Sequence, residues 1–211
     1  MLTLYVVRHG QTAANRSGVL QGHLDVPLSG LGQEQAEMVG WALKDVSFDA
    51  VYSSDLSRAR QTAEAIMKHH TCRLVLDRRL REVHVGVFQG HTDREAQRLY
   101  PEERRLLRKD PVNYRRPGGE SFQDLCDRVS RALADITEWH TKDDADKTAA
   151  IISHGGAINA LFRALGHPIA GVVGNCSISV FRFEAGKWEI VRINDVTHLK
   201  DLASDLVERV P

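Results

Sequence analysis

Two mainly apolar runs of the chain each end at a histidine. The run over residues 3–7 is followed by Arg8 and His9, and the run over 149–153 is followed by His154. Uninterrupted apolar runs of this length are typical of strands that are covered on both faces, as in a parallel sheet. We therefore predict two buried strands, each with a histidine directly beyond its carboxyl end.

Strands and helices alternate through much of the remaining chain. Shorter apolar runs predict two further strands, over 48–52 and 73–76. Apolar residues also recur at helical spacing in four segments, which indicates amphipathic helices. These helices are predicted to begin at Ser29, at Ser54 or Asp55, at Ser121 and after Gly156. Such alternation is typical of an α/β sheet.

The end of the chain predicts a different kind of pairing. Two β-like segments, 177–184 and 188–194, are connected by a short turn over 185–187, which predicts a hairpin at the edge of the sheet. We expect a single three-layer α/β domain over residues 1–211, with helices on both faces of a mixed, mainly parallel sheet. An irregular helical insertion at about 91–120 is expected to form a lid-like addition.

Basic residues are concentrated in this insertion. One interpretation is a solvent-exposed helix face, balanced by Glu95, Glu102 and Glu103. The other is a lid whose cations meet an anionic substrate. Both interpretations concern the same eight side chains, which are Arg94, Arg98, Arg104, Arg105, Arg108, Lys109, Arg115 and Arg116.

Composition and charge limit the classes of partner. Hydrophobic residues make up 42% of the chain and charged residues 27%, as in ordinary globular proteins. The formal net charge is zero, so the field of the whole molecule gives no reason to expect binding to nucleic acid or to a membrane. Any anion must therefore be bound by a local cluster of cationic side chains.

The cysteines and the N-terminal sequence indicate in which cellular compartment the protein is expected. Cys72, Cys126 and Cys176 are far apart and odd in number, which argues against a zinc motif and predicts three buried thiols in a reducing compartment. The N-terminus lacks a basic stretch before a long apolar segment, and no apolar run approaches about 18 residues. We expect a cytoplasmic protein that is monomeric or homodimeric.

Candidate catalytic residues follow the carboxyl ends of the predicted strands. Ligands of open α/β sheets bind beyond the carboxyl ends of the strands, which would bring Arg8, His9 and His154 together. Arg58 lies in the first turn of the helix after the 48–52 strand, where backbone N–H groups already favour an anion. A histidine nucleophile within a cationic cradle is suited to phosphoryl transfer.

Four groups of residues resemble, in order, the motifs of the histidine phosphatase superfamily, in its phosphoglycerate-mutase-like branch. They cover nearly the whole chain and are far more specific together than a single Arg-His-Gly triplet. The stretch over 117–122 also resembles that of broad-specificity and α-ribazole-type phosphatases. The groups are Arg8-His9-Gly10 with Thr12, Asn15 and Gln21-Gly22-His23; Ser53-Ser54 with Arg58-Ala59 and Thr62; Leu80-Arg81-Glu82 with Gly86 and Gly90; and Ser153-His154-Gly155-Gly156.

The resemblance implies a metal-independent hydrolase of small phosphate monoesters that needs no cofactor. His9 would attack phosphorus and form a phosphohistidine, while Glu82 would protonate the leaving alcohol and later deprotonate the attacking water. Arg8, Arg58 and His154 would neutralise the phosphoryl oxygens. Further phosphate contacts are expected from Asn15, Gln21, Gly22 and the backbone N–H of Gly155.

Two other functions remain open. A phosphoglycerate mutase would transfer the phosphoryl group between alcohols, but mutases of this superfamily carry a longer insertion than the one between Glu82 and His154. A non-catalytic module that binds phosphorylated ligands would be expected to have lost the nucleophile or an arginine. Cys176 and Arg182 have the spacing of cysteine-dependent phosphatases, but the residues between them alternate as in a strand.

Overall fold

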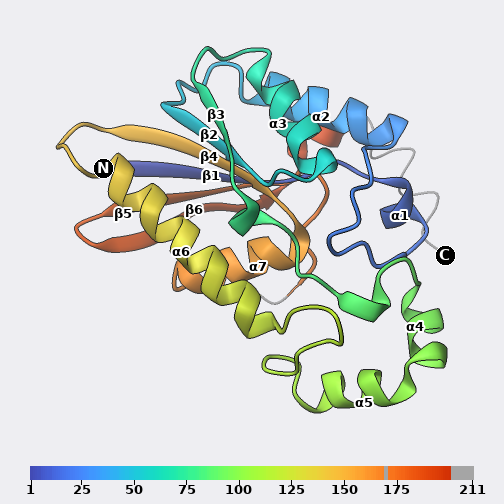
Figure 1. Ribbon diagram of the computed structural model, residues 1–211. Helices are drawn as coiled ribbons and strands as arrows, with labels where there is room; N and C mark the ends of the chain where they lie inside the picture. Colours follow the sequence, from blue (N-terminus) through green and yellow to red (C-terminus); the bar gives the residue numbers. More distant parts are fainter. Residues whose placement is uncertain (169–170, 201–211) are drawn as a thin grey trace.

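A six-stranded sheet runs through the molecule in the order β3-β2-β4-β1-β5-β6 (Figure 1). The first four strands of this order are mutually parallel. β5 pairs antiparallel with β1, and β6 pairs antiparallel with β5. The sheet is therefore mixed and mainly parallel, with the predicted hairpin at one edge. The strands are β1 (Leu2–Arg8), β2 (Ala50–Ser53), β3 (Arg73–Leu76), β4 (Lys147–Ser153), β5 (Ile178–Glu184) and β6 (Lys187–Asp195).

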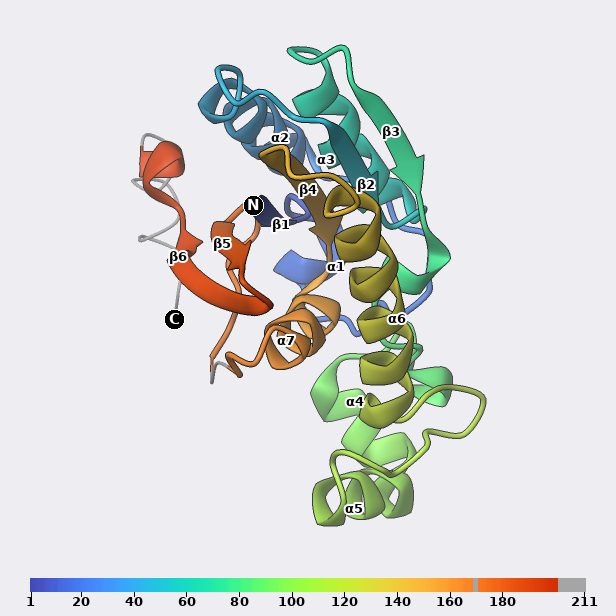
Figure 2. The same ribbon diagram turned by 90° about the vertical axis from the view of Figure 1, so that its left-hand side faces the viewer.

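Helices cover both faces of the sheet, as predicted (Figures 1 and 2). On one face, α2 (Gly30–Ala42) and α3 (Ser57–Met67) bury a core that includes Val39, Ile66 and Ile152. On the other face, α6 (Phe122–His140) and α7 (Gly155–Ala164) pack over a second core. Because β1 and β4 contribute side chains to both cores, their central residues are apolar on both faces of the sheet.

Capping residues explain where the long helices begin. Ser29 caps α2 and Ser121 caps α6, as the sequence predicts. The helix expected from Ser54 or Asp55 instead has Leu56 as its N-cap and begins at Ser57, so the predicted cap is wrong by one or two residues. The cause is a distant cap, because the amide and hydroxyl of Ser57 both donate to the carboxylate of Asp25.

The segment between β3 and α6 forms short helices beside the sheet (Figure 1). Its α4 (Asp93–Leu99) and α5 (Pro101–Lys109) meet at Tyr100, because Pro101 begins a new helix there. The remaining short elements are α1 (Ala13–Arg16) and the 3₁₀ turns η1 (Arg78–Leu80), η2 (Gly86–Phe88) and η3 (Thr197–Leu199).

The computed structural model describes residues 1–168 and 171–200, so residues 169–170 and 201–211 of the expected domain lie outside the described residues. Within the described part, no helix combines the length and apolar character needed to cross a membrane. Cys126 and Cys176 are buried, but Cys72 is only partly buried because it lies in the connection that leads into β3. The expectation of three buried thiols is therefore wrong for Cys72.

Candidate active site

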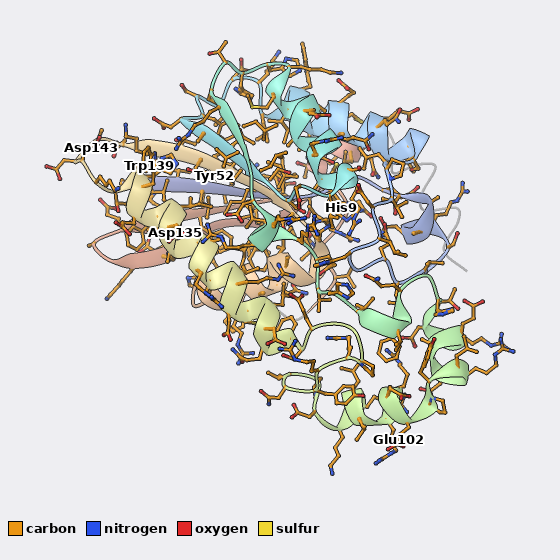
Figure 3. The ribbon with its side chains drawn as sticks, viewed as in Figure 1. His9, Tyr52, Glu102, Asp135, Trp139 and Asp143 are labelled. Carbon is orange, nitrogen blue, oxygen red and sulfur yellow. The ribbon has the colours of Figure 1, made fainter. Side chains whose placement is uncertain are left out.

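The register of β1 and β4 places two histidine rings side by side. Arg8 pairs with Ser153 in the parallel ladder, and the His9 amide donates to the Ser153 carbonyl oxygen at 2.9 Å. His9 and His154 follow these two residues, and their ring centroids are 5.0 Å apart at an interplanar angle of 60°. In Figure 3, His9 lies at the end of the central strands, whereas Glu102 lies on the outer side of α5.

His9 is a buried, neutral imidazole, and one of its nitrogens has no hydrogen-bond partner among the described residues. Its Nδ1 lies 2.7 Å from the carbonyl oxygen of Gly10. A carbonyl oxygen can only accept, so Nδ1 carries the proton and Nε2 keeps its lone pair. Burial, and then the charges of Arg58 and Arg8, hold the pKa of His9 well below its usual value. The ring is therefore neutral at neutral pH, and its Nε2 is unprotonated, as a nucleophile requires.

His154 is fully buried, and both of its ring nitrogens have protein partners. Nδ1 accepts from Nε of Arg58 at 3.2 Å, so Nε2 carries the proton and donates to Oγ of Ser54 at 2.8 Å. Burial and the charge of Arg58 lower the pKa of His154 well below its usual value. The structure thus places His154 behind Arg58, where it orients the guanidinium group.

Two guanidinium groups are aimed at the space beside His9. Arg58 donates to the carbonyl oxygens of Leu24 and Gly22, at 2.8 and 2.9 Å, and burial lowers its pKa to about 10. Arg8 donates to the carbonyl oxygen of Val173, and its buried Nε has no hydrogen-bond partner among the described residues. Both side chains therefore remain charged at neutral pH, and a buried donor without a partner favours an anionic ligand.

A cavity of about 360 Å³ opens at this point. Seven of the nine candidate site residues line it, whereas His154 and Gly155 are not among the lining residues. Gly155 packs against Arg8, since a Cβ at this position would lie 3.7 Å from Arg8 Nε. The lining residues are Arg8, His9, Asn15, Val19, Leu20, Gln21, Gly22, Arg58, Glu82, Val83, Val85, Phe88, Arg104, Leu107, Arg116 and Gly156.

Thr12 orients two carboxamide groups at the cavity wall. Oδ1 of Asn15 accepts from the amide and hydroxyl of Thr12, and the same hydroxyl lies 3.1 Å from Oε1 of Gln21. The oxygen atoms of both carboxamides thus face Thr12. Their NH₂ groups are not used in hydrogen bonds to described residues, so they are the donors left for a ligand.

Glu82 reaches the cavity from the loop after η1. Its Oε1 accepts the amide of Val83 at 2.8 Å, and its Oε2 accepts the amide of Gly156 at 3.0 Å. The second amide belongs to the first turn of α7, where unpaired N–H groups favour a carboxylate. The carboxyl group is therefore held in one position at the cavity wall.

Some cations of the arginine-rich insertion line the cavity, and others are exposed to solvent. Arg104 and Arg116 line the cavity, and Arg116 forms no salt bridge with any described residue. Burial and the charge of Arg104 lower the pKa of Arg116. Arg105 and Arg115 are exposed and pair with acidic residues of the surface. Two cations of the insertion thus face the cavity, and others cover a solvated helix face.

Three contacts of the site had no signal or only a weak one in the sequence. Asn175 donates through Nδ2 to the His9 carbonyl oxygen at 2.9 Å, and nothing in the pattern of the chain singles it out. Ser54 lies in a motif and at a predicted helix start, but nothing in the sequence indicates its hydrogen bond with His154. Arg128, on α6, donates to the Glu82 carbonyl oxygen. In the sequence it is an ordinary polar position of an amphipathic helix.

Cys176 and Arg182 do not form a phosphatase loop. The Cys176 thiol is fully buried, and burial raises its pKa, whereas Arg182 is exposed on β5. Residues 178–182 belong to β5, as the alternating pattern predicts, and do not form a loop around an anion.

Comparison with known proteins places this geometry in a family. The model of the histidine phosphatase superfamily (branch 1) matches residues 4–196. Phosphoglycerate mutase-like protein 4 of Arabidopsis thaliana is 38% identical over 205 residues, which are 94% of this chain and 87% of that protein. A mycobacterial glucosyl-3-phosphoglycerate phosphatase structure is 32% identical with a TM-score of 0.77, covering 90% of this chain and 97% of its own. The α-ribazole phosphatase of Shigella flexneri is 28% identical with a TM-score of 0.82, covering 92% and 96% respectively.

Proposed function

The chain belongs to the histidine phosphatase superfamily (branch 1), and from this premise we propose that it hydrolyses phosphate monoesters through a phosphohistidine at Nε2 of His9. Membership confirms the resemblance drawn from the four motifs, and the similar solved structures include phosphatases. The observation that carries the proposal is the neutral His9 ring, whose unprotonated Nε2 stands in a cavity with two arginines.

The first step forms a bond from Nε2 of His9 to phosphorus and breaks the bond from phosphorus to the alcohol oxygen. Glu82 gives its proton to the departing oxygen, which leaves as the alcohol. Arg8 and Arg58 neutralise the charge on the phosphoryl oxygens, and each charge-assisted contact contributes about 1.5–3 kcal/mol.

The second step releases the enzyme. Water attacks phosphorus, the Glu82 carboxylate takes a proton from that water, and the bond from phosphorus to Nε2 breaks. Inorganic phosphate leaves and His9 returns to its neutral form. Asn15 and Gln21 supply further donors through their free NH₂ groups, and His154 acts by holding Arg58 in place.

The outer cavity suggests the chemical class of the substrate. Val19, Leu20 and Leu107 give the cavity apolar lining, while Arg104 and Arg116 add positive charge besides that of Arg8 and Arg58. These features support a small phosphorylated metabolite whose alcohol carries apolar groups and a further negative charge.

Phosphoryl transfer between alcohols, as in a mutase, is the second candidate. The name of the Arabidopsis relative favours it. A mutase must keep water away from its phosphohistidine, so the product of the phosphoenzyme distinguishes the two. Release of inorganic phosphate supports hydrolysis, and transfer to an added phosphoglycerate without release supports the mutase.

The phosphoenzyme can be trapped with a ³²P-labelled substrate. We expect a label that is lost in acid, is stable in alkali and is absent in His9→Ala. We also expect p-nitrophenyl phosphate to be hydrolysed in the presence of EDTA. A His9→Ala variant that hydrolyses this ester as fast as the wild type would refute the mechanism, and no turnover across a panel of monoesters would indicate a binding module.

A further inference from the structure

Arg128, on α6, uses every N–H of its guanidinium group inside the protein. Nη1 donates to the carbonyl oxygens of Arg79 and Arg81, at 2.8 and 2.7 Å, and Nη2 donates to that of Glu82 at 2.7 Å. Nε and Nη2 also donate to the two carboxylate oxygens of Glu120, each at 2.9 Å. A guanidinium group has five N–H bonds, and these five contacts account for all of them.

Glu120 holds the same segment at its other end. Its carboxylate accepts the amide of His84 at 2.9 Å, and its own amide donates to the His84 carbonyl oxygen at 2.8 Å. Burial tends to raise the pKa of Glu120, but the hydrogen bonds from Arg128 and His84 bring it below its usual value. The carboxylate is thus charged, and it fixes the planar guanidinium group through two parallel hydrogen bonds.

His23 approaches the Glu82 peptide from the opposite side. Its Nε2 donates to the Glu82 carbonyl oxygen at 2.8 Å, so this one oxygen accepts from both His23 and Arg128. The peptide that carries the candidate acid is therefore clamped between α6 and the loop that contains His23. Its side chain then extends to the amide of Gly156.

We propose that Arg128 is the positioning residue for Glu82. By fixing the main-chain carbonyl groups of Arg79, Arg81 and Glu82, it sets the distance between the Glu82 carboxyl group and the leaving oxygen of the substrate. The inference rests on the proposed function, because it takes Glu82 as the proton donor. Arg128 does not line the cavity, so it acts only through the two proton transfers of Glu82, and only the first of these depends on the leaving alcohol.

The fold has other anchors for this segment. Oγ of Ser153 donates to the Leu80 carbonyl oxygen at 2.7 Å, and Arg79 pairs with Asp77 and Asp135. Replacement of Arg128 therefore leaves the segment attached to β4 and α6 but frees the Glu82 peptide. A lysine retains the charge, yet it has three donors instead of five and lacks the planar fork.

The test compares two esters in Arg128→Gln, Arg128→Lys and Glu120→Gln. An alkyl phosphate such as glycerol phosphate needs a proton on its leaving oxygen. The p-nitrophenolate group of p-nitrophenyl phosphate leaves readily without one. General acid catalysis contributes about 10²–10⁴-fold, so we expect kcat/KM on the alkyl ester, which reports the steps up to formation of the phosphohistidine, to fall about 10–100-fold. On the aryl ester we expect a loss of less than about 3-fold. Arg131→Gln, an exposed arginine on the same helix, is the matched control and should resemble wild type.

The outcomes separate the positioning role from a structural one. Equal losses of kcat/KM on both esters in every variant that folds, and hence an unchanged ratio of the two kcat/KM values, would overturn the proposal. Added guanidinium ion, at concentrations that leave the protein folded, should selectively restore the hydrolysis of the alkyl ester by Arg128→Ala. If the wild type hydrolyses neither ester, the proposed function itself is wrong, whereas an active wild type with an unaltered ratio in the variants refutes only the role of Arg128.

Discussion

The carboxyl group of Glu82 lies directly against the backbone of Gly156. Oε2 of Glu82 accepts the Gly156 amide at 3.0 Å, and a Cβ added at position 156 would fall well inside contact distance of Oε1. Glycine is needed here because the carboxylate occupies the space of a side chain. The relationship links the candidate acid to the first turn of α7, two residues beyond His154.

Replacement of Gly156 by alanine should therefore displace Glu82. We expect kcat on an alkyl phosphate to fall by about 10–100-fold, since a displaced general acid loses part of its contribution. Gly155→Ala is the matched comparison, because its Cβ would meet only Arg8 at an ordinary contact distance. Steady-state kinetics of the two variants check this, and an equal loss in both would contradict it.

Much of the fold was predictable from the sequence because the strands are covered on both faces. Two apolar runs that end at His9 and His154 had to become central parallel strands, and adjacent parallel strands end at the same edge of a sheet. The hairpin at the sheet edge and the caps at Ser29 and Ser121 followed from local patterns in the same way.

Contacts that depend on packing between distant elements were not predictable. The start of α3 is set by Asp25, which is far away in the chain, so local capping rules favour the wrong residue. Arg116 and Arg115 are neighbours in sequence, yet only Arg116 lines the cavity. Periodicity alone does not say which of two adjacent cations turns inward.

The difference between Arg115 and Arg116 provides a test of whether the cavity recognises a second negative charge on the substrate. Arg116→Gln removes a partly buried charge that no described carboxylate pairs with, so we expect KM to rise about 10-fold for a monoester that carries a carboxylate, which corresponds to about 1.4 kcal/mol. Arg115→Gln removes an exposed charge and should change KM little. The two variants are compared on such an ester and on p-nitrophenyl phosphate. A rise of the same size on both esters would show that Arg116 does not recognise the second charge.

A close approach of two backbones fixes the loop after His9. A Cβ at Gly32, in the first turn of α2, would overlap the carbonyl oxygen of Gln11. We expect Gly32→Ala to lower the free energy of unfolding by about 1–3 kcal/mol, as overpacking does. Gly30→Ala adds the same methyl group where nothing lies within 4 Å, so it should be neutral or slightly stabilising. Urea unfolding measures both, and equal stabilities would show that α2 can shift freely away from the loop.

Acid should destabilise the protein through its buried histidines. Burial and the arginines keep His9 and His154 neutral in the folded state, with pKa values well below the usual one. In the unfolded chain a histidine binds its proton near pH 6.5, so the unfolded state takes up more protons than the folded state as the pH falls below about 6.5. Each such group contributes its full stability above that pH and loses up to about 1.4 kcal/mol per pH unit below it.

The measurement is urea unfolding at several values between about pH 7.5 and pH 5. His154→Gln removes one of these titrations, so its free energy of unfolding should fall less steeply with decreasing pH than that of the wild type. The comparison uses the slope because the substitution itself changes the absolute stability. Identical slopes would mean that His154 is protonated in the folded state, and its Nδ1 then could not accept from Arg58.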